Sequence, residues 1–124
     1  MKILVVDDER DIQALFEQRF RKEIRENQMS FAFAFSGEEA MAYLEHDNHG
    51  AVLILSDINM PGMSGLELLK NIKGKYHNPP PLVMMMTAYG DADNHNMALQ
   101  LGADDFLTKP IEFNLLKEKL YTIK

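Results

Sequence analysis

Apolar residues recur along the chain in two alternating patterns. Short apolar runs, rich in branched and aromatic side chains, begin at residue 2 and return four more times. Such runs are typical of strands. The segments between them carry apolar residues three or four positions apart, which is the spacing of one face of a helix. The predicted strands are Lys2–Val6, Met29–Phe35, Ala51–Ser56, Leu82–Met86 and Ala103–Thr108.

Each predicted strand is followed by a helical pattern with recognisable end signals. Ser36 and Glu39 are spaced as a capping box, and Ser64 with Glu67 offers a second helix cap. Gly102 is placed to close a helix at its C-terminal end. The apolar stripes lie at Ile12, Leu15, Phe16, Phe20 and Ile24; at Ala40, Met41 and Leu44; at Leu66, Leu69 and Ile72; within Asp91–Leu101; and within Asn114–Ile123.

Strand–helix alternation with short connections builds a parallel sheet covered by helices on both faces. A length of 124 residues corresponds to one domain. We therefore expect a single α/β domain over residues 1–124, with the (βα)5 doubly wound, flavodoxin-like architecture. In the strand order 2-1-3-4-5, the first and third strands are neighbours.

Composition narrows the function classes. The formal net charge of −6 disfavours a surface that tracks nucleic-acid phosphates. The longest apolar runs have five residues, far fewer than the roughly twenty of a membrane span. Cysteine is absent, which excludes disulfides and thiolate zinc sites, and no secretory signal is recognised before the first strand. A cytoplasmic protein without direct nucleic-acid or membrane binding is expected.

Polar side chains stand where four of the predicted strands end. Asp7 and Asp8 follow the first strand, Asp57 the third, Thr87 the fourth and Lys109 the fifth. In an open α/β sheet this edge binds ligands, in the crevice where the strand order reverses. An aspartate after one strand is usually a turn residue or a helix cap. Five functional groups at four strand ends are much harder to explain as turn chemistry.

Crowded carboxylates at that edge require a cation. Two carboxylates about 4 Å apart repel by roughly 4 kcal/mol at an effective dielectric near 20. Oxygen ligands contributed by few protein groups suit Mg²⁺, which keeps several of its waters. With the hydroxyl of Thr87 and the charge of Lys109 nearby, the pocket is arranged for a phosphoryl group that a carboxylate can attack.

The chain resembles the response-regulator receiver domains of two-component signalling. The resemblance rests on the segments VVDDE, LSDINMPGMSG, MTA and FLTKP, in order and over essentially the whole chain. It implies that Asp57 is the phosphoacceptor and that Asp8 binds Mg²⁺ directly. It also implies that Asp7 binds the ion mainly through water, and that the backbone carbonyl of Asn59 is a further ligand.

The same resemblance assigns roles to the remaining motif residues. Thr87 would bond a phosphoryl oxygen and shift toward it, and Lys109 would pair with another oxygen. Phe106 would be the switch aromatic that turns inward when Thr87 moves. The Lys109–Pro110 peptide bond is expected to be cis. Tyr89 and Asn59 differ from the commonest choices of the family, and we expect Tyr89 to shield the phosphoryl group and slow its hydrolysis.

The resulting hypothesis is a phosphorylation-controlled switch rather than a metabolic enzyme. A histidine kinase or phosphotransfer protein would supply the phosphoryl group. A downstream effector would read the face formed by Asp91–Leu101, Ala103–Thr108 and Asn114–Ile123. The chain is expected to be a monomer or a phosphorylation-dependent dimer. The alternative is a receiver-like interaction module that works without phosphorylation.

Two further alternatives fit the residues less well. A haloacid-dehalogenase-type phosphatase places its nucleophile in an Asp-x-Asp pattern after the first strand and carries a cap domain, whereas Asp7 and Asp8 are adjacent here. A flavodoxin-like carrier of flavin mononucleotide needs a hydroxyl- and glycine-rich phosphate loop at that place. Asp7, Asp8 and Glu9 would repel such a phosphate.

Overall fold

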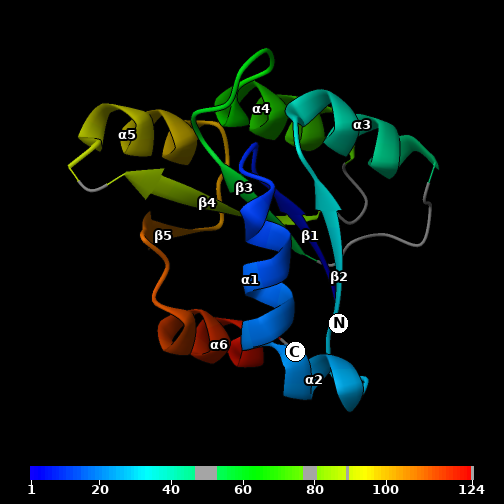
Figure 1. The fold of residues 1–124 in the computed structure, drawn as a ribbon. Coiled ribbons are helices and arrows are strands. Elements are labelled where there is room, and N and C mark those ends of the chain that lie inside the picture. Colours follow the sequence, from blue (N-terminus) through cyan, green and yellow to red (C-terminus); the bar gives the residue numbers. More distant parts are fainter. Residues whose placement is uncertain (47–52, 77–80, 89, 124) are drawn as a thin grey trace.

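The fold centres on one parallel sheet of five strands in the order β2-β1-β3-β4-β5 (Figure 1). The structure is a computed structural model, and it describes residues 1–46, 53–76, 81–88 and 90–123. The strands are β1 (Lys2–Val6), β2 (Ser30–Ala34), β3 (Leu53–Asp57), β4 (Leu82–Ala88) and β5 (Asp105–Lys109). The predicted doubly wound α/β architecture and its strand order are confirmed.

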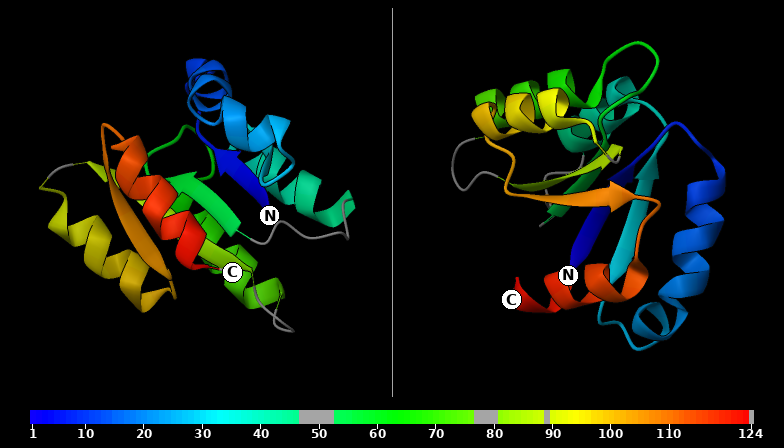
Figure 2. Two further views of the ribbon diagram at one scale, coloured as in Figure 1. Left: turned by 90° about the horizontal axis from the view of Figure 1, so that it is seen from below. Right: turned by 90° about the vertical axis from the view of Figure 1, so that its left-hand side faces the viewer.

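Helices cover both faces of the sheet. They are α1 (Asp11–Arg19), α2 (Arg21–Arg25), α3 (Gly37–His46), α4 (Gly65–Lys75), α5 (Ala92–Gln100) and α6 (Phe113–Thr122). Two views of the ribbon place α1 and α6 on one face of the sheet and α3, α4 and α5 on the other (Figures 1 and 2). Across the described ranges, no helix has both the length and the hydropathy to cross a membrane.

The first helical segment differs from the prediction of one continuous helix. It is divided into α1 and α2 at Phe20, whose backbone angles (φ −107°, ψ 19°) leave the helical region. The Phe20 ring is fully buried and packs against Phe16 and Phe31, with ring centroids 5.8 and 4.9 Å apart. The apolar spacing identified most of the buried side of this segment, since Ile12, Phe16 and Phe20 are buried, but Leu15 is 37% exposed.

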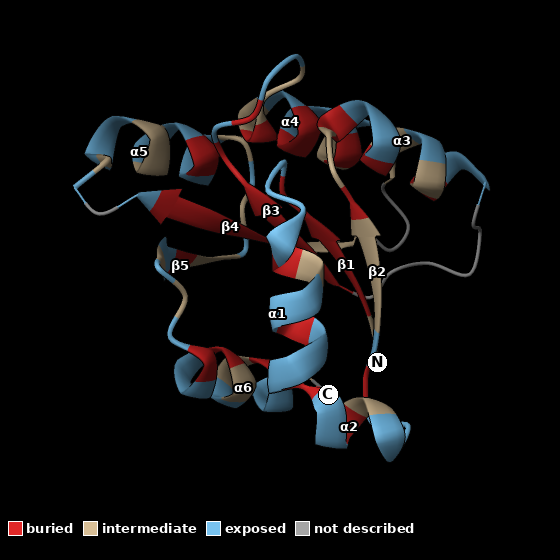
Figure 3. Cartoon of the chain, viewed as in Figure 1, coloured by how far each residue is buried: buried red, intermediate tan, exposed pale blue. Residues whose placement is uncertain are grey.

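Alternate residues of the central strands enter two separate cores. Ile3 and Val5 of β1 face α1 and α6, whereas Leu4 and Val6 face α3 and α4. The same alternation continues in β3 and β4, where Met84 and Met86 lie on the first side and Met85 on the second. The central strands are buried on both faces (Figure 3). Burial on both faces explains why these strands appear in the sequence as continuous apolar runs.

The helix ends follow the predicted signals with one change. The Ser36 hydroxyl accepts from the Glu39 N–H (3.0 Å), but the Glu39 carboxylate accepts from the N–H of Phe35 rather than Ser36 (3.2 Å). Ser64 caps α4 by accepting from the Glu67 N–H. Helix α5 ends in two bonds typical of a Schellman motif, with Gly102 at φ +100°. The caps at Ser36 and Ser64 fix where loops from the carboxyl edge of the sheet join α3 and α4, whereas Gly102 ends α5 before the chain enters β5.

Candidate functional site

The reversal of strand order brings two distant segments together at the carboxyl edge of the sheet. Strands β1 and β3 are hydrogen-bonded neighbours, and Val6 pairs with Ser56. Asp7 and Asp8 directly follow β1, and Asp57 is the last residue of β3. The carboxylates of Asp7, Asp8 and Asp57 therefore meet, with one oxygen from each lying within 4.8 Å of the others.

The three carboxylates differ in their contact with solvent. Asp7 is fully buried and Asp57 is 8% exposed, whereas Asp8 lies at the surface. Asp7 Oδ1 accepts a hydrogen bond from the Glu9 N–H at 3.0 Å, which fixes one of its oxygens. The Ser56 hydroxyl donates to the backbone carbonyl of Asp57 at 2.9 Å. The site thus has a rigid inner part and one ligand group open to water.

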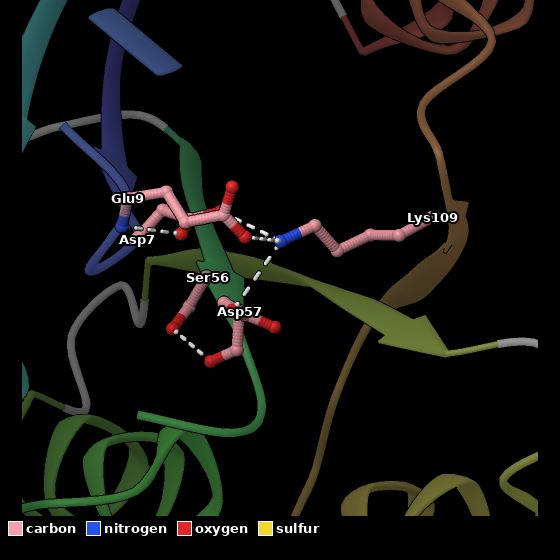
Figure 4. A network of polar contacts seen from close by, with 5 residues as sticks. All are labelled: Asp7, Glu9, Ser56, Asp57 and Lys109. Carbon is pink, nitrogen blue, oxygen red and sulfur yellow. Dashed lines mark hydrogen bonds and ion pairs between the residues drawn. The ribbon is translucent and has the colours of Figure 1, made fainter. Parts of the chain in front are cut away.

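Lys109 is the cation of this cluster. It extends from the end of β5, past β4, so that its Nζ lies 3.0 Å from Asp7 Oδ2 and 3.4 Å from Asp57 Oδ2 (Figure 4). A third carboxylate oxygen, that of Glu9, lies 3.7 Å away. One lysine balances only part of the charge of Asp7, Asp8 and Asp57, so the site retains a net negative charge.

The ionisation of Asp57 and Lys109 reflects this environment. Burial is the largest cause that raises the pKa of Asp57 above its ordinary value; Lys109 acts against the rise and the charge of Asp7 adds to it. Burial lowers the pKa of Lys109, but its hydrogen bond to Asp7 and the charges of Asp57 and Asp7 outweigh that effect, so this pKa lies above its ordinary value. Lys109 is therefore charged at neutral pH.

Thr87 and Phe106 lie on the neighbouring strands, outside the carboxylate cluster. Thr87 is buried in β4 and pairs with Thr108, and its hydroxyl donates a long hydrogen bond (3.5 Å) to the carbonyl of Leu107. It borders a hollow of about 340 Å³ that extends to the first turn of α5. Phe106 is half-buried and its ring lies 3.8 Å from the ring of His95.

The other predicted site features are placed as follows. Asn59 is exposed in the loop that follows β3. The Lys109–Pro110 peptide bond is cis, as the resemblance implied. Tyr89 lies outside the described residues, so its predicted shielding role stays a prediction.

The donor set suits a small divalent cation. Three carboxylates converge from two adjacent strand ends, and one of them reaches solvent. Hard oxygen ligands with room for water are what Mg²⁺ favours. The lysine leaves enough negative charge for such an ion, and it adds a positive group beside Asp57 that an incoming anion could contact.

Comparison with known proteins shows to which protein family this chain belongs. Residues 3–121 match the response regulator receiver domain. The chain belongs to this receiver family. Among relatives, PilR of Pseudomonas aeruginosa is 37% identical over 121 residues, and CpxR of Klebsiella pneumoniae is 33% identical over 122 residues. Each alignment covers 98% of this chain, but only 25% of PilR and 48% of CpxR. The chain thus spans half or less of these relatives.

Solved receiver structures agree with the fold. The receiver domain of a Francisella response regulator has a TM-score of 0.80 at 30% identity, and the match covers 98% of this chain and 94% of that one. A putative response regulator from Chloroflexus aurantiacus has a TM-score of 0.84 at 26% identity, with 98% and 95% covered. The predicted receiver resemblance is confirmed.

Sequence reasoning missed several contacts around the receiver site. It gave no role to Glu9 as a partner of Lys109, to the Ser56 hydroxyl, or to His95 beside Phe106. None of these residues has a distinctive local pattern. The partners of Glu9 and His95 lie on other elements, so those contacts exist only after the chain has folded, whereas the Ser56 hydroxyl bonds to the carbonyl of the next residue in the same strand.

Proposed function

We propose that this receiver domain accepts a phosphoryl group on Asp57, with Mg²⁺ bound, and thereby acts as a two-component signalling switch. The observation that carries the proposal is the meeting of three carboxylates with the Lys109 ammonium at the switch point of the sheet. Membership of the receiver family supports a phosphoacceptor role in the same place.

The metal would be held by Asp8 directly, by Asp7 mainly through water, and by Asp57 and the backbone carbonyl of Asn59. When bound, Mg²⁺ supplies positive charge to the oxygens of the phosphoryl group. Asp7 is already fixed by the Glu9 N–H and by Lys109, which suits a residue that orients water rather than one that moves. The exposed carboxylate of Asp8 remains open to solvent, as an entering ion requires.

The transfer step follows from the position of Asp57. A carboxylate oxygen of Asp57 attacks the phosphorus of a phosphohistidine on a kinase or phosphotransfer protein. The new P–O bond forms as the P–N bond breaks, and the electron pair stays on the imidazole nitrogen. Lys109 pairs with one phosphoryl oxygen and compensates the added charge. Hydrolysis of the acyl phosphate returns Asp57 to its original state.

The conformational response involves Thr87 and Phe106. Phosphorylation adds acceptor oxygens near the end of β4, and the Thr87 hydroxyl exchanges its long bond to Leu107 for a phosphoryl oxygen. Phe106 then leaves its contact with His95 and turns inward. These movements reshape the face of α5, β5 and α6, which a downstream effector reads. The shift can be only as large as the difference in interaction energy between the two states.

Intact-mass measurement tests this function. The chain is incubated with acetyl phosphate and Mg²⁺ and should gain the mass of one phosphoryl group, while the Asp57→Asn variant and a sample in EDTA should not. Comparing the molecular size of the untreated and phosphorylated forms in the same buffer would show whether the chain is a monomer or a phosphorylation-dependent dimer. Absence of any mass gain in the wild type would favour the alternative of a phosphorylation-independent module.

A further inference from the structure

The loop between β3 and α4 is closed at its base by one hydrogen bond and held at its tip by another element. It starts at Ile58, which is buried, and passes through Asn59, the proposed carbonyl ligand. At the α4 end, the Gly65 N–H donates to the Ile58 carbonyl at 2.7 Å, which closes the base of the loop. The path of the loop beyond this base is set by other contacts.

The tip of the loop is held by α3, an element that contributes nothing to the carboxylate cluster. The Glu38 carboxylate accepts a hydrogen bond from the Met63 N–H at 3.1 Å. The same carboxylate also packs close to Gly62. A Cβ added to Gly62 would lie only 2.8 Å from Glu38 Oε2. Gly62 has φ +72°, so the turn already adopts the left-handed conformation that glycine favours.

The Met63 side chain is held on two further sides. A Cβ at Gly37 would lie 2.9 Å from Met63 side-chain atoms, which is too close for a normal contact. The Met63 side chain therefore packs directly on the α3 backbone at a position where only glycine fits. The Asn71 amide of α4 contacts the Met63 sulfur at 3.7 Å. Met63 thus inserts between α3 and α4, and its N–H points to Glu38.

The capping arrangement of α3 explains why Glu38 is available for this contact. Glu39 is engaged with the N–H of Phe35, and Ser36 accepts from the Glu39 N–H. These two bonds orient the first turn of α3. Glu38, which directly precedes Glu39 in that turn, faces the loop. Among residues 1–46, 53–76, 81–88 and 90–123, its carboxylate accepts a hydrogen bond from the Met63 N–H alone.

We propose that Glu38 is a positioning residue that holds the β3–α4 loop, and with it the Asn59 carbonyl, in the conformation that binds Mg²⁺. The inference rests on the proposed metal site. Glu38 itself would not contact the ion or the phosphoryl group. It acts through the Met63 N–H and the Gly62 turn. By ordering the loop in advance, it lowers the entropy cost of ordering the loop when the ion binds.

The first test needs no metal. Amide exchange is measured residue by residue by NMR in EDTA for the wild type, Glu38→Ala and Glu38→Gln. The Met63 amide should exchange about tenfold faster in Glu38→Ala, since a charge-assisted hydrogen bond is lost. Glu38→Gln keeps an acceptor oxygen at the same reach, so its exchange should stay within about threefold of the wild type. Equal exchange in all three proteins would overturn the proposal.

The second test measures Mg²⁺ affinity by calorimetry on the same proteins. Glu38→Ala should bind about three- to tenfold more weakly, whereas Glu38→Gln should stay near the wild type. Because Glu38→Gln removes the same charge, similar weakening in both variants would mean that only electrostatic attraction was lost, and the positioning role would be refuted.

A matched control is available on the same helix. Glu45 of α3 also bridges to α4, through Lys75 at 2.8 Å, and among the described residues its carboxylate forms no hydrogen bond or ion pair with the loop over residues 58–64. Glu45→Ala should leave both the Met63 exchange rate and the Mg²⁺ affinity unchanged. If the wild type itself binds no Mg²⁺, the proposed function fails; if it binds normally and Glu38→Ala binds equally well, only the role of Glu38 fails.

Discussion

Replacing Asp57 with asparagine should stabilise the metal-free protein, although it removes the proposed phosphoacceptor. Asp57 lies in a cluster where its oxygen is within 4.8 Å of oxygens of both Asp7 and Asp8. At an effective dielectric of about 20, each of these repulsions amounts to at least about 3.5 kcal/mol. The attraction between Asp57 and Lys109 at 3.4 Å amounts to about 5 kcal/mol on the same scale.

These terms leave Asp57 with a net unfavourable interaction of about 2 kcal/mol, to which its burial adds. Partial solvation and salt reduce the effect, so we expect Asp57→Asn to gain about 1 to 2 kcal/mol in EDTA at neutral pH. For a domain of this size the thermal midpoint should rise by about 3 to 6 °C. The measurement is thermal unfolding followed by circular dichroism at low ionic strength.

The dependence of this gain on pH gives an independent check. The pKa of Asp57 in the folded protein is raised, mainly by burial. Its ionised form therefore lowers the free energy of unfolding at a pH above that pKa. This loss of stability disappears at a pH below the ordinary aspartate pKa, where the side chain is protonated in both states. The difference in midpoint between Asp57→Asn and the wild type should therefore shrink as the pH falls toward the ordinary aspartate value, because the Asp57 carboxyl becomes increasingly protonated in both the folded and the unfolded state.

A second variant separates this effect from net charge. Glu118 is exposed on α6, which covers the face of the sheet opposite to α3 and α4. Glu118→Gln removes one negative charge without relieving a close repulsion, and its midpoint should change by less than about 2 °C. If Asp57→Asn were no more stable than the wild type at pH 7 in EDTA, or if Glu118→Gln gave an equal gain, the electrostatic reasoning would be wrong.

Three further outcomes can be checked with the wild type, Asp57→Asn and two further variants. Mg²⁺ at about a hundred times its dissociation constant should stabilise the wild type by about 2.7 kcal/mol and Asp57→Asn much less; equal stabilisation would contradict the proposed ligand set. Lys109→Met should cost about 2 kcal/mol in EDTA, because buried Asp7 loses its cation, yet should bind Mg²⁺ more tightly in calorimetry. Gly65→Ala should lose at least about 3 kcal/mol in urea unfolding, since its Cβ would overlap the Asp57 carbonyl; a smaller loss would mean that the loop moves freely.

Much of the architecture could be predicted from local patterns. The central strands are apolar on both sides because two cores cover them, so β1, β3 and β4 appear as uninterrupted apolar runs. Helix ends were marked by Ser36, Ser64 and Gly102, which act within a few residues of themselves. The continuous helix predicted through Phe20 was wrong, because a break in the helix axis leaves the apolar spacing unchanged.

The amino-acid sequence by itself determined which chemical groups stand at the strand ends, since Asp7, Asp8, Asp57 and Lys109 follow directly from where the apolar runs stop. Only the tertiary structure decided that the Lys109 ammonium lies between Asp7 and Asp57, that Glu9 joins them, and that Glu38 reaches the β3–α4 loop. The physical reason is the distance along the chain over which each kind of interaction acts. Strand and cap signals act between near neighbours in the chain, whereas these contacts depend on strand order, register and side-chain reach between segments that meet only in the folded protein.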